Sequence, residues 1–201
     1  MSSLFSTYLQ LGFTHITDLE GYDHILFIVA LCAIYSLRQW RSVAVLVTAF
    51  TIGHSVTLAM AALDVIQVNG PLIELLIPIT ILLTAIYNVV VHRFDKRSSS
   101  NIFSRQFSWN YLFALIFGLI HGMGFSNFLR ASLLPGQEDQ LVTQLLAFNV
   151  GVELGQLAIV GIILGISVLA FQVFKVKQRE WNLFVSGAAA GIALLMVLER
   201  V

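Results

Sequence analysis

Charged side chains are scarce in this chain of 201 residues, and their scarcity is the first indication of its environment. Only 11% of the residues are charged, whereas 58% are hydrophobic, and the mean hydropathy is +0.87. An average soluble domain contains roughly a quarter charged residues. A chain with so few cannot cover its surface with polar groups, so we expect most of that surface to contact lipid.

The sequence also has no excess of either charge sign, and it has only one cysteine. Its 11 basic and 11 acidic residues cancel, so it has no basic field with which to bind nucleic acid. The single cysteine, Cys32, lies in an apolar stretch. One thiol cannot form a disulfide framework within the chain, and it argues against a thiolate-rich metal site.

Long apolar stretches fill the rest of the sequence and predict an all-α fold, a single transmembrane domain over residues 1–201. A helix needs about 20 apolar residues to cross a hydrocarbon core about 30 Å thick. Six stretches qualify, at about residues 21–38, 42–66, 71–92, 109–131, 141–174 and 181–199. Before them, residues 3–17 mix apolar and polar side chains and predict a short interfacial or re-entrant helix.

Basic residues are unevenly distributed between the predicted loops, which sets the expected orientation. The loops after the first, third and fifth predicted spans hold most of the lysines and arginines, and the loop after the second holds none. Since cytoplasmic loops collect Lys and Arg, we expect both termini outside. Asp23 and His24 would then lie near the outer surface, and His54, His121 and Glu153 near the middle of the membrane.

Ionisable residues inside these apolar stretches are candidate functional residues, because burying such groups in a membrane costs free energy. Imidazole nitrogens and carboxylate oxygens are ligands that suit nickel, zinc and cobalt. The sequence therefore predicts a site for a divalent transition metal in the outer half of the membrane. The candidate ligands are Asp23, His24, His54, His121 and Glu153.

A second set of polar residues is expected around that site or along a pathway through the membrane. Its members are His15, Ser55, Glu74, Asn88, Asn149 and Gln156. A polar residue in a membrane helix often only forms a hydrogen bond between helices, and that interpretation remains open for Asn149 and Gln156. Glycine pairs four residues apart, such as Gly118 with Gly122, would let helices approach closely and would allow homo-oligomers.

Four ordered motifs resemble those of the HupE/UreJ family of bacterial membrane proteins. They are Gly-Tyr-Asp-His-Ile-Leu-Phe (21–27), Thr-Ala-Phe-Thr-Ile-Gly-His-Ser-Val-Thr-Leu (48–58), Phe-Gly-Leu-Ile-His-Gly-Met-Gly-Phe (117–125) and Phe-Asn-Val-Gly-Val-Glu-Leu-Gly-Gln (148–156). The resemblance implies a multi-pass protein of the bacterial inner membrane that acts as a nickel or cobalt permease. By this resemblance, Asp23 and His24 correspond to the family's histidine-aspartate signature.

Two other functions remain open for the same residues. A metal-dependent intramembrane hydrolase would use a zinc-type ion to activate water, with Asp23, Ser55 and Glu153 as candidate catalytic residues. A polar network with a purely structural role in a scaffold protein is the third interpretation.

Overall fold

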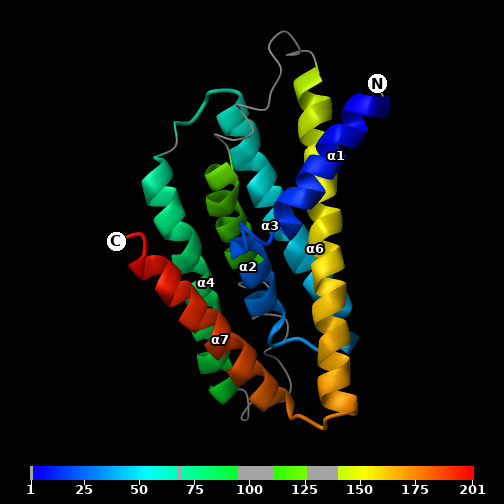
Figure 1. Ribbon diagram of the computed structural model, residues 1–201, viewed down its shortest axis with the longest axis vertical. Helices are drawn as coiled ribbons and strands as arrows, with labels where there is room; N and C mark the ends of the chain where they lie inside the picture. Colours follow the sequence, from blue (N-terminus) through cyan, green and yellow to red (C-terminus); the bar gives the residue numbers. More distant parts are fainter. Residues whose placement is uncertain (1, 68, 95–110, 126–139) are drawn as a thin grey trace.

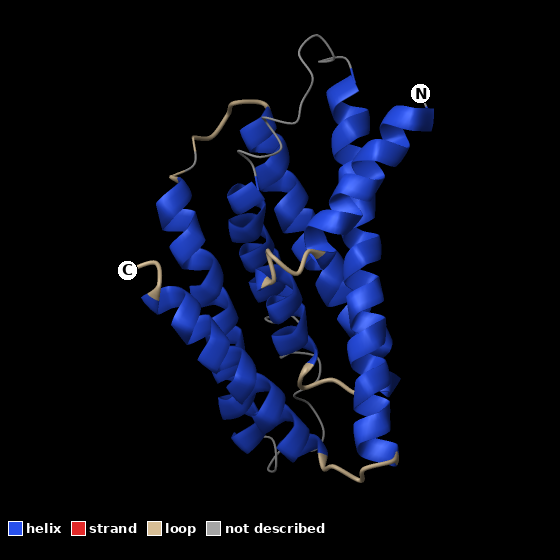
Figure 2. Cartoon of the chain, in the orientation of Figure 1, coloured by secondary structure: helices blue, strands red, loops and turns tan. Residues whose placement is uncertain are grey.

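A computed structural model of the chain describes residues 2–67, 69–94, 111–125 and 140–201. These residues confirm the all-α class: they form helices joined by short turns, and none of them lies in a strand (Figure 2).

Four of the helices are long and apolar enough to cross a membrane. Their bounds are α3 (Trp40–Ala62), α4 (Gly70–Phe94), α6 (Leu141–Gln172) and α7 (Gln178–Leu198). Each agrees with its predicted stretch to within about one helical turn. Pro78 lies inside α4, and the helix continues through it. Membrane helices tolerate such a proline because their surroundings can satisfy the freed backbone groups.

The predicted count of six spanning helices is not confirmed, because within the described residues the two remaining apolar helices are shorter than a membrane span. They are α2 (Asp23–Cys32) and the helix Tyr111–Phe125. The stretch predicted over residues 21–38 ends early because polar residues start a new element beyond Cys32. There Ser36 and Gln39 cap the 3₁₀ turn Leu37–Gln39, and the backbone nitrogen of Ser36 donates to Gln39 Oε1 at 3.1 Å.

The N-terminal segment forms the helix α1 (Ser2–Thr17), which agrees with the helix predicted over residues 3–17. Figure 1 shows α1 running beside the first half of α6 and ending near the middle of the molecule, where α2 begins. Asp23 and His24 therefore lie about half-way along the bundle, and not near its end as the sequence predicts. The reason is that α1 already occupies the first part of that path, from the N-terminal end of the bundle to its middle.

Glycines hold α1 tightly against α6. A Cβ atom on Gly12 would overlap the backbone carbonyl of Phe148, and one on Gly151 would overlap the backbone carbonyl of Leu9. Between the two helices, Ile16 and Phe148 are fully buried. This contact between small residues fixes the end of α1, and with it the position of His15.

The helix α2 lies at the centre of the bundle and contributes to two apolar cores (Figure 1). Ile28 and Cys32 belong to a core shared with α1, α3 and α6. Phe27 and Ala30 face a core shared with α4, α7 and the helix Tyr111–Phe125. The first turn of α2 is therefore enclosed, although the helix is only 10 residues long.

The turn after α2 and the turn after α6 meet at one end of the bundle. Gln178 Nε2, in the first residue of α7, donates to the carbonyl oxygen of Ile34 at 2.9 Å, which joins the start of α7 to the turn after α2. Figure 1 shows the turn between α3 and α4 at the opposite end. This arrangement gathers Arg38, Lys175 and Lys177 at one end, in agreement with the distribution of charge expected from the sequence.

Candidate metal centre

Three histidines from three helices meet where α1 ends and α2 begins. His15 lies in the last turn of α1, His24 in the first turn of α2, and His54 in the second half of α3. One ligand nitrogen from each ring lies within 4.8 Å of the other two. Because neutral imidazole suits nickel, zinc and cobalt, this cluster has the donor chemistry of a transition-metal site.

The three rings lie at an angle to one another instead of stacking flat. The ring centroids of His15 and His24 are 4.6 Å apart at an interplanar angle of 69°, and those of His24 and His54 are 6.1 Å apart. His24 is 5% exposed and His54 is 0% exposed, whereas His15 is only half-buried. The cluster is therefore closed on the sides of α2 and α3 and accessible beside His15.

Several nitrogens of this cluster are buried without a hydrogen-bond partner. They are Nε2 of His15, Nε2 of His24 and both ring nitrogens of His54. Leaving a buried polar atom unsatisfied costs about 1–3 kcal/mol. A metal ion bound by one nitrogen from each ring would remove that cost for the three ligating atoms, since each would donate its lone pair to the ion, while the other nitrogen of His54 carries the proton of the neutral ring.

Asp23 orients the ring of His24. Nδ1 of His24 donates to Oδ1 of Asp23 at 2.9 Å, and the backbone nitrogen of His24 donates to the same oxygen at 2.8 Å. With its proton on Nδ1, the neutral ring presents the lone pair of Nε2 to the cluster. A carboxylate that fixes the tautomer of a ligand in this way also raises the basicity of that ligand.

His121 lies on the other side of His24 and outside the group of three. Its ring centroid is 5.2 Å from that of His24, and its Nε2 lies 3.1 Å from the hydroxyl of Thr80. The ring is 0% exposed, and its Nδ1 has no partner. The close contact of Gly122 with the backbone of His54 holds this helix against α3. His121 is thus a neighbour of the cluster whose Nε2 is already engaged.

Aromatic rings surround the histidines. Phe125 packs on His15 with 3.7 Å between ring centroids, and the ring of Phe148 lies 6.4 Å from that of His54 at an angle of 16°. Phe50 lies 5.2 Å from His121. These apolar walls limit the access of water to the side beside His15, so electrostatic interactions inside the cluster are stronger than in solvent.

Glu153, which the sequence places among the ligands, binds hydroxyl groups of α3. Its carboxylate accepts from Thr48 Oγ1 at 2.6 Å and from Thr51 Oγ1 at 2.5 Å. The hydroxyl of Thr51 also lies 2.7 Å from Oε1 of Gln156. Because Thr51 precedes His54 by one turn of α3, this group of oxygens lies next to the histidines on the side of the basic end.

The remaining predicted residues have local roles in the structure. The hydroxyl of Ser55 donates to the carbonyl oxygen of Thr51 at 2.6 Å, and Nδ2 of Asn149 donates to Leu145 at 2.8 Å. Glu74 is exposed on α4, where its carbonyl oxygen accepts from Arg200 at 2.9 Å. These contacts give none of the three side chains a partner among the histidines.

Asn88 joins helices within the bundle. Its Nδ2 donates to the carbonyl oxygen of Ala30 at 2.6 Å, and Nδ2 of Asn182 donates to the carbonyl oxygen of Asn88 at 3.0 Å. Asn88 is 2% exposed. Its contacts are those of a hydrogen-bonded link between α2, α4 and α7.

A cavity of about 690 Å³ with both polar and apolar walls opens beside His15. Thr14, Asp18 and Phe125 contribute to its wall, and Thr14 and Asp18 are exposed. The opening of this cavity beside His15, the mouth of the site, is not among the features predicted from the sequence. The spacing of Leu11, Thr14 and His15 could have indicated it, because residues at i, i+3 and i+4 share one face of a helix, and Asp18 follows directly after the end of α1.

Comparison with known proteins assigns the chain to a family. No curated protein and no solved structure matches it. The family described as HupE / UreJ protein matches residues 1–200, which is nearly the whole chain, and this family is associated with nickel and cobalt transport. The match confirms the resemblance carried by the four motifs and agrees with four apolar helices and a histidine cluster. The chain belongs to the HupE/UreJ family.

Proposed function

We propose that this protein is a permease that binds a divalent transition metal, nickel or a similar ion, and carries it across the membrane. One observation carries the proposal: imidazole nitrogens of His15, His24 and His54 lie within 4.8 Å of one another with no hydrogen-bond partner for most of them. Three neutral imidazoles leave a coordination position open, which allows an ion to exchange instead of being locked in place.

The membrane arrangement we propose has six crossings. In it α1 and α2 together make the first crossing as a helix broken near the middle, and the helix Tyr111–Phe125 contributes to the fourth. Transporters often hold their substrate at such a break, near the bilayer midplane. The basic end with Arg38 and Lys175 faces the cytoplasm, and both termini lie outside a bacterial inner membrane.

The route of the ion begins at the mouth beside His15. Asp18 and Thr14 supply oxygen atoms at the surface, and the histidines lie directly behind them. Glu153, with Thr48 and Thr51, would receive the ion next, since this group lies about one helical turn further toward the basic end. Asn149 and Gln156 stay candidates for a supporting role along this part of α6.

A hydrolase remains the alternative, and the contacts favour it less. That reaction requires Ser55 or Glu153 beside the bound ion. Instead, Ser55 donates to the carbonyl of Thr51 at 2.6 Å, and Glu153 accepts from the hydroxyls of Thr48 and Thr51. Asp23 is hydrogen-bonded to His24 and orients it, so it is not placed as a free base.

Homo-oligomers are also part of the proposal, through two open glycine pairs. Nothing lies within 4 Å of a Cβ atom built on Gly161, Gly165, Gly187 or Gly191. Such faces on α6 and α7 allow the helix of another copy to approach closely.

Uptake by proteoliposomes tests the proposed function. Liposomes that contain the purified protein and an internal metal-sensitive dye receive external Ni²⁺, Co²⁺ or Zn²⁺. We expect influx above that of empty liposomes, and loss of this influx for His54→Ala. Metal bound at one ion per chain without any flux would reject transport and favour the hydrolase. Absence of both binding and flux would reject the metal site itself.

A further inference from the structure

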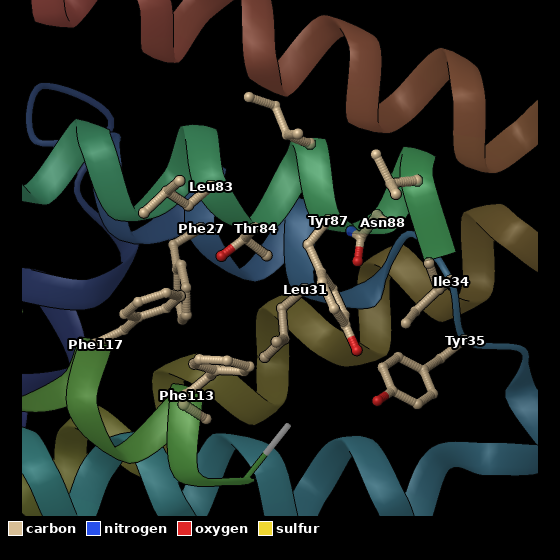
Figure 3. A pocket seen from close by; sticks show the side chains of 13 residues that line it. Phe27, Leu31, Ile34, Tyr35, Leu83, Thr84, Tyr87, Asn88, Phe113 and Phe117 are labelled. Carbon is tan, nitrogen blue, oxygen red and sulfur yellow. The ribbon is translucent and has the colours of Figure 1, made fainter. Parts of the chain in front are cut away.

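A second cavity lies along α2, on the side away from the mouth at His15. It has a volume of about 450 Å³ and lies between α2, α4 and the helix Tyr111–Phe125 (Figure 3). Phe27 and Phe117 form one end, and Tyr35, Tyr87 and Asn88 lie toward the other. The cavity is therefore apolar at the end near the histidines and more polar at the end near the turn after α2.

This cavity is poorly suited to water or to a hydrated ion. The hydroxyl of Thr84 donates to the carbonyl oxygen of Thr80 at 2.8 Å, and Nδ2 of Asn88 donates to Ala30 at 2.6 Å. The polar side chains of Thr84 and Asn88 are thus engaged within the protein. A buried water needs two to four polar partners. The space next to Leu31 and Phe117 favours an apolar occupant.

The rim of the cavity belongs to the outer surface of the bundle. Leu83 is 52% exposed, Ile86 48% and Phe113 41%, and all three line the cavity. In a membrane protein these side chains contact acyl chains. The cavity is continuous with that lipid-facing surface, so an acyl chain can enter it sideways between α4 and the helix Tyr111–Phe125.

We propose that the cavity binds one acyl chain of a membrane phospholipid, from the leaflet that borders the turn after α2. The tail reaches Phe27 and Phe117, and the more polar end of the lipid remains near Tyr35 and Tyr87. The apolar area that the chain covers supplies the affinity, at roughly 25 cal/mol per Å² removed from water.

The occupant would touch the wall of the metal centre through one side chain. Phe27 is 1% exposed, lines the cavity, and lies 5.3 Å from His121 and 5.0 Å from Phe50 between ring centroids. A bound acyl chain fills the space into which the ring of Phe27 could otherwise turn. The site thus keeps Phe27 packed against His121.

Photo-crosslinking in nanodiscs tests the proposal without any metal. The nanodiscs consist of phosphatidylcholine that carries a diazirine near the end of one acyl chain, and adducts are mapped by mass spectrometry of peptides. Phe117 is the diagnostic residue, because it lies at the same end of the cavity as the buried Phe27 and is itself only partly buried, so a chain inside the cavity contacts it. We expect adducts at Phe117 and at the rim residue Ile86, with Phe148, buried outside the cavity, as the background.

A cavity-filling variant supplies the control. Ala114 is 1% exposed and lines the cavity, so Ala114→Phe would occupy the space of the acyl chain. Adducts at Phe117 should fall to background while those at Ile86 stay unchanged. Leu31→Trp is the second variant if Ala114→Phe does not purify as a folded protein. Adducts confined to the rim in the wild type, or unchanged adducts at Phe117 in a folded filled variant, would overturn the proposal.

Discussion

Oδ1 of Asp23 accepts two hydrogen bonds from His24, one from the ring at 2.9 Å and one from the backbone at 2.8 Å. The two residues are adjacent in the chain, and α2 begins with them. The carboxylate thus holds the ring while Nε2, buried without a partner, points away from it. This pair links the local sequence to the proposed metal centre.

Removal of the carboxylate should weaken metal binding without abolishing it. We predict that Asp23→Ala lowers the affinity for Ni²⁺ or Zn²⁺ about 10–100-fold, as for other residues that orient a metal-ligating histidine. Asp23→Asn should lose less, since its amide oxygen can still accept from Nδ1 of His24. Calorimetric titration of the purified protein measures both variants. Equal affinity for Asp23→Ala and the wild type would remove Asp23 from the site.

Loss of a ligand should have a larger effect than loss of a neighbour. His54 is 0% exposed, and neither ring nitrogen has a partner, so His54→Ala removes a ligand and should reduce affinity by more than about 100-fold. His121→Gln is the matched variant, because its amide can still bond to Thr80. Its affinity should remain closer to that of the wild type. If His121→Gln lowered the affinity more than His54→Ala does, the ion would bind on the Thr80 side of His24.

The sequence placed His24 and His54 among the candidate ligands but gave His15 only a supporting role. The pattern of apolar residues predicts the helix α1, but it gives no information about the contact with α6 that positions the end of this helix. That contact depends on Gly12 and Gly151, which bring two backbones together from distant parts of the chain. His15 joins the cluster only because that packing brings it there.

The depth of the site was also difficult to predict. Counting residues from the start of a predicted span places Asp23 at the surface, because the count assumes that the helix begins there. Figure 1 shows that α1 covers the first half of the path and that α2 begins in the interior. The interruption between α1 and α2 lies inside the bundle, and the hydrophobic pattern of the sequence does not reveal it. The roles of Glu153 and Asn88 likewise depended on partners in other helices.

The close contact between α1 and α6 should be essential for metal binding. A Cβ atom on Gly12 would overlap the carbonyl of Phe148, so Gly12→Ala should cost about 1–3 kcal/mol of stability and displace His15. Thermal unfolding in detergent and metal titration measure these effects.

The control for Gly12→Ala is Gly161→Ala, because nothing lies within 4 Å of a Cβ atom at Gly161. This variant should match the wild type in both stability and metal affinity. If Gly12→Ala also matched the wild type, the packing of α1 on α6 would not determine the site.

Glu153 should affect transport more than binding. Its carboxylate is held by the hydroxyls of Thr48 and Thr51, about one turn of α3 from His54. Glu153→Gln retains an oxygen acceptor but removes the charge that would draw the cation onward. We predict that proteoliposome uptake falls while the affinity of the histidine cluster stays within about threefold of the wild type, a change of less than 1 kcal/mol.

Thr48→Val tests the position of Glu153 independently of its charge, because it removes one hydroxyl that holds the carboxylate and leaves the carboxylate itself in place. This variant should show an intermediate rate of uptake. A Glu153→Gln protein that transports normally but binds metal weakly would instead make Glu153 a direct ligand of the ion.

X-ray absorption spectroscopy of the metal-loaded protein tests the central claim most directly, because it identifies the atoms that surround the ion. With Zn²⁺ bound at one ion per chain, we predict scattering from three imidazole nitrogens at about 2.0–2.1 Å. Replacing His15, His24 and His54 together should abolish this signal. A bound ion surrounded only by oxygen atoms, or unchanged imidazole scattering in the triple variant, would contradict the proposed site.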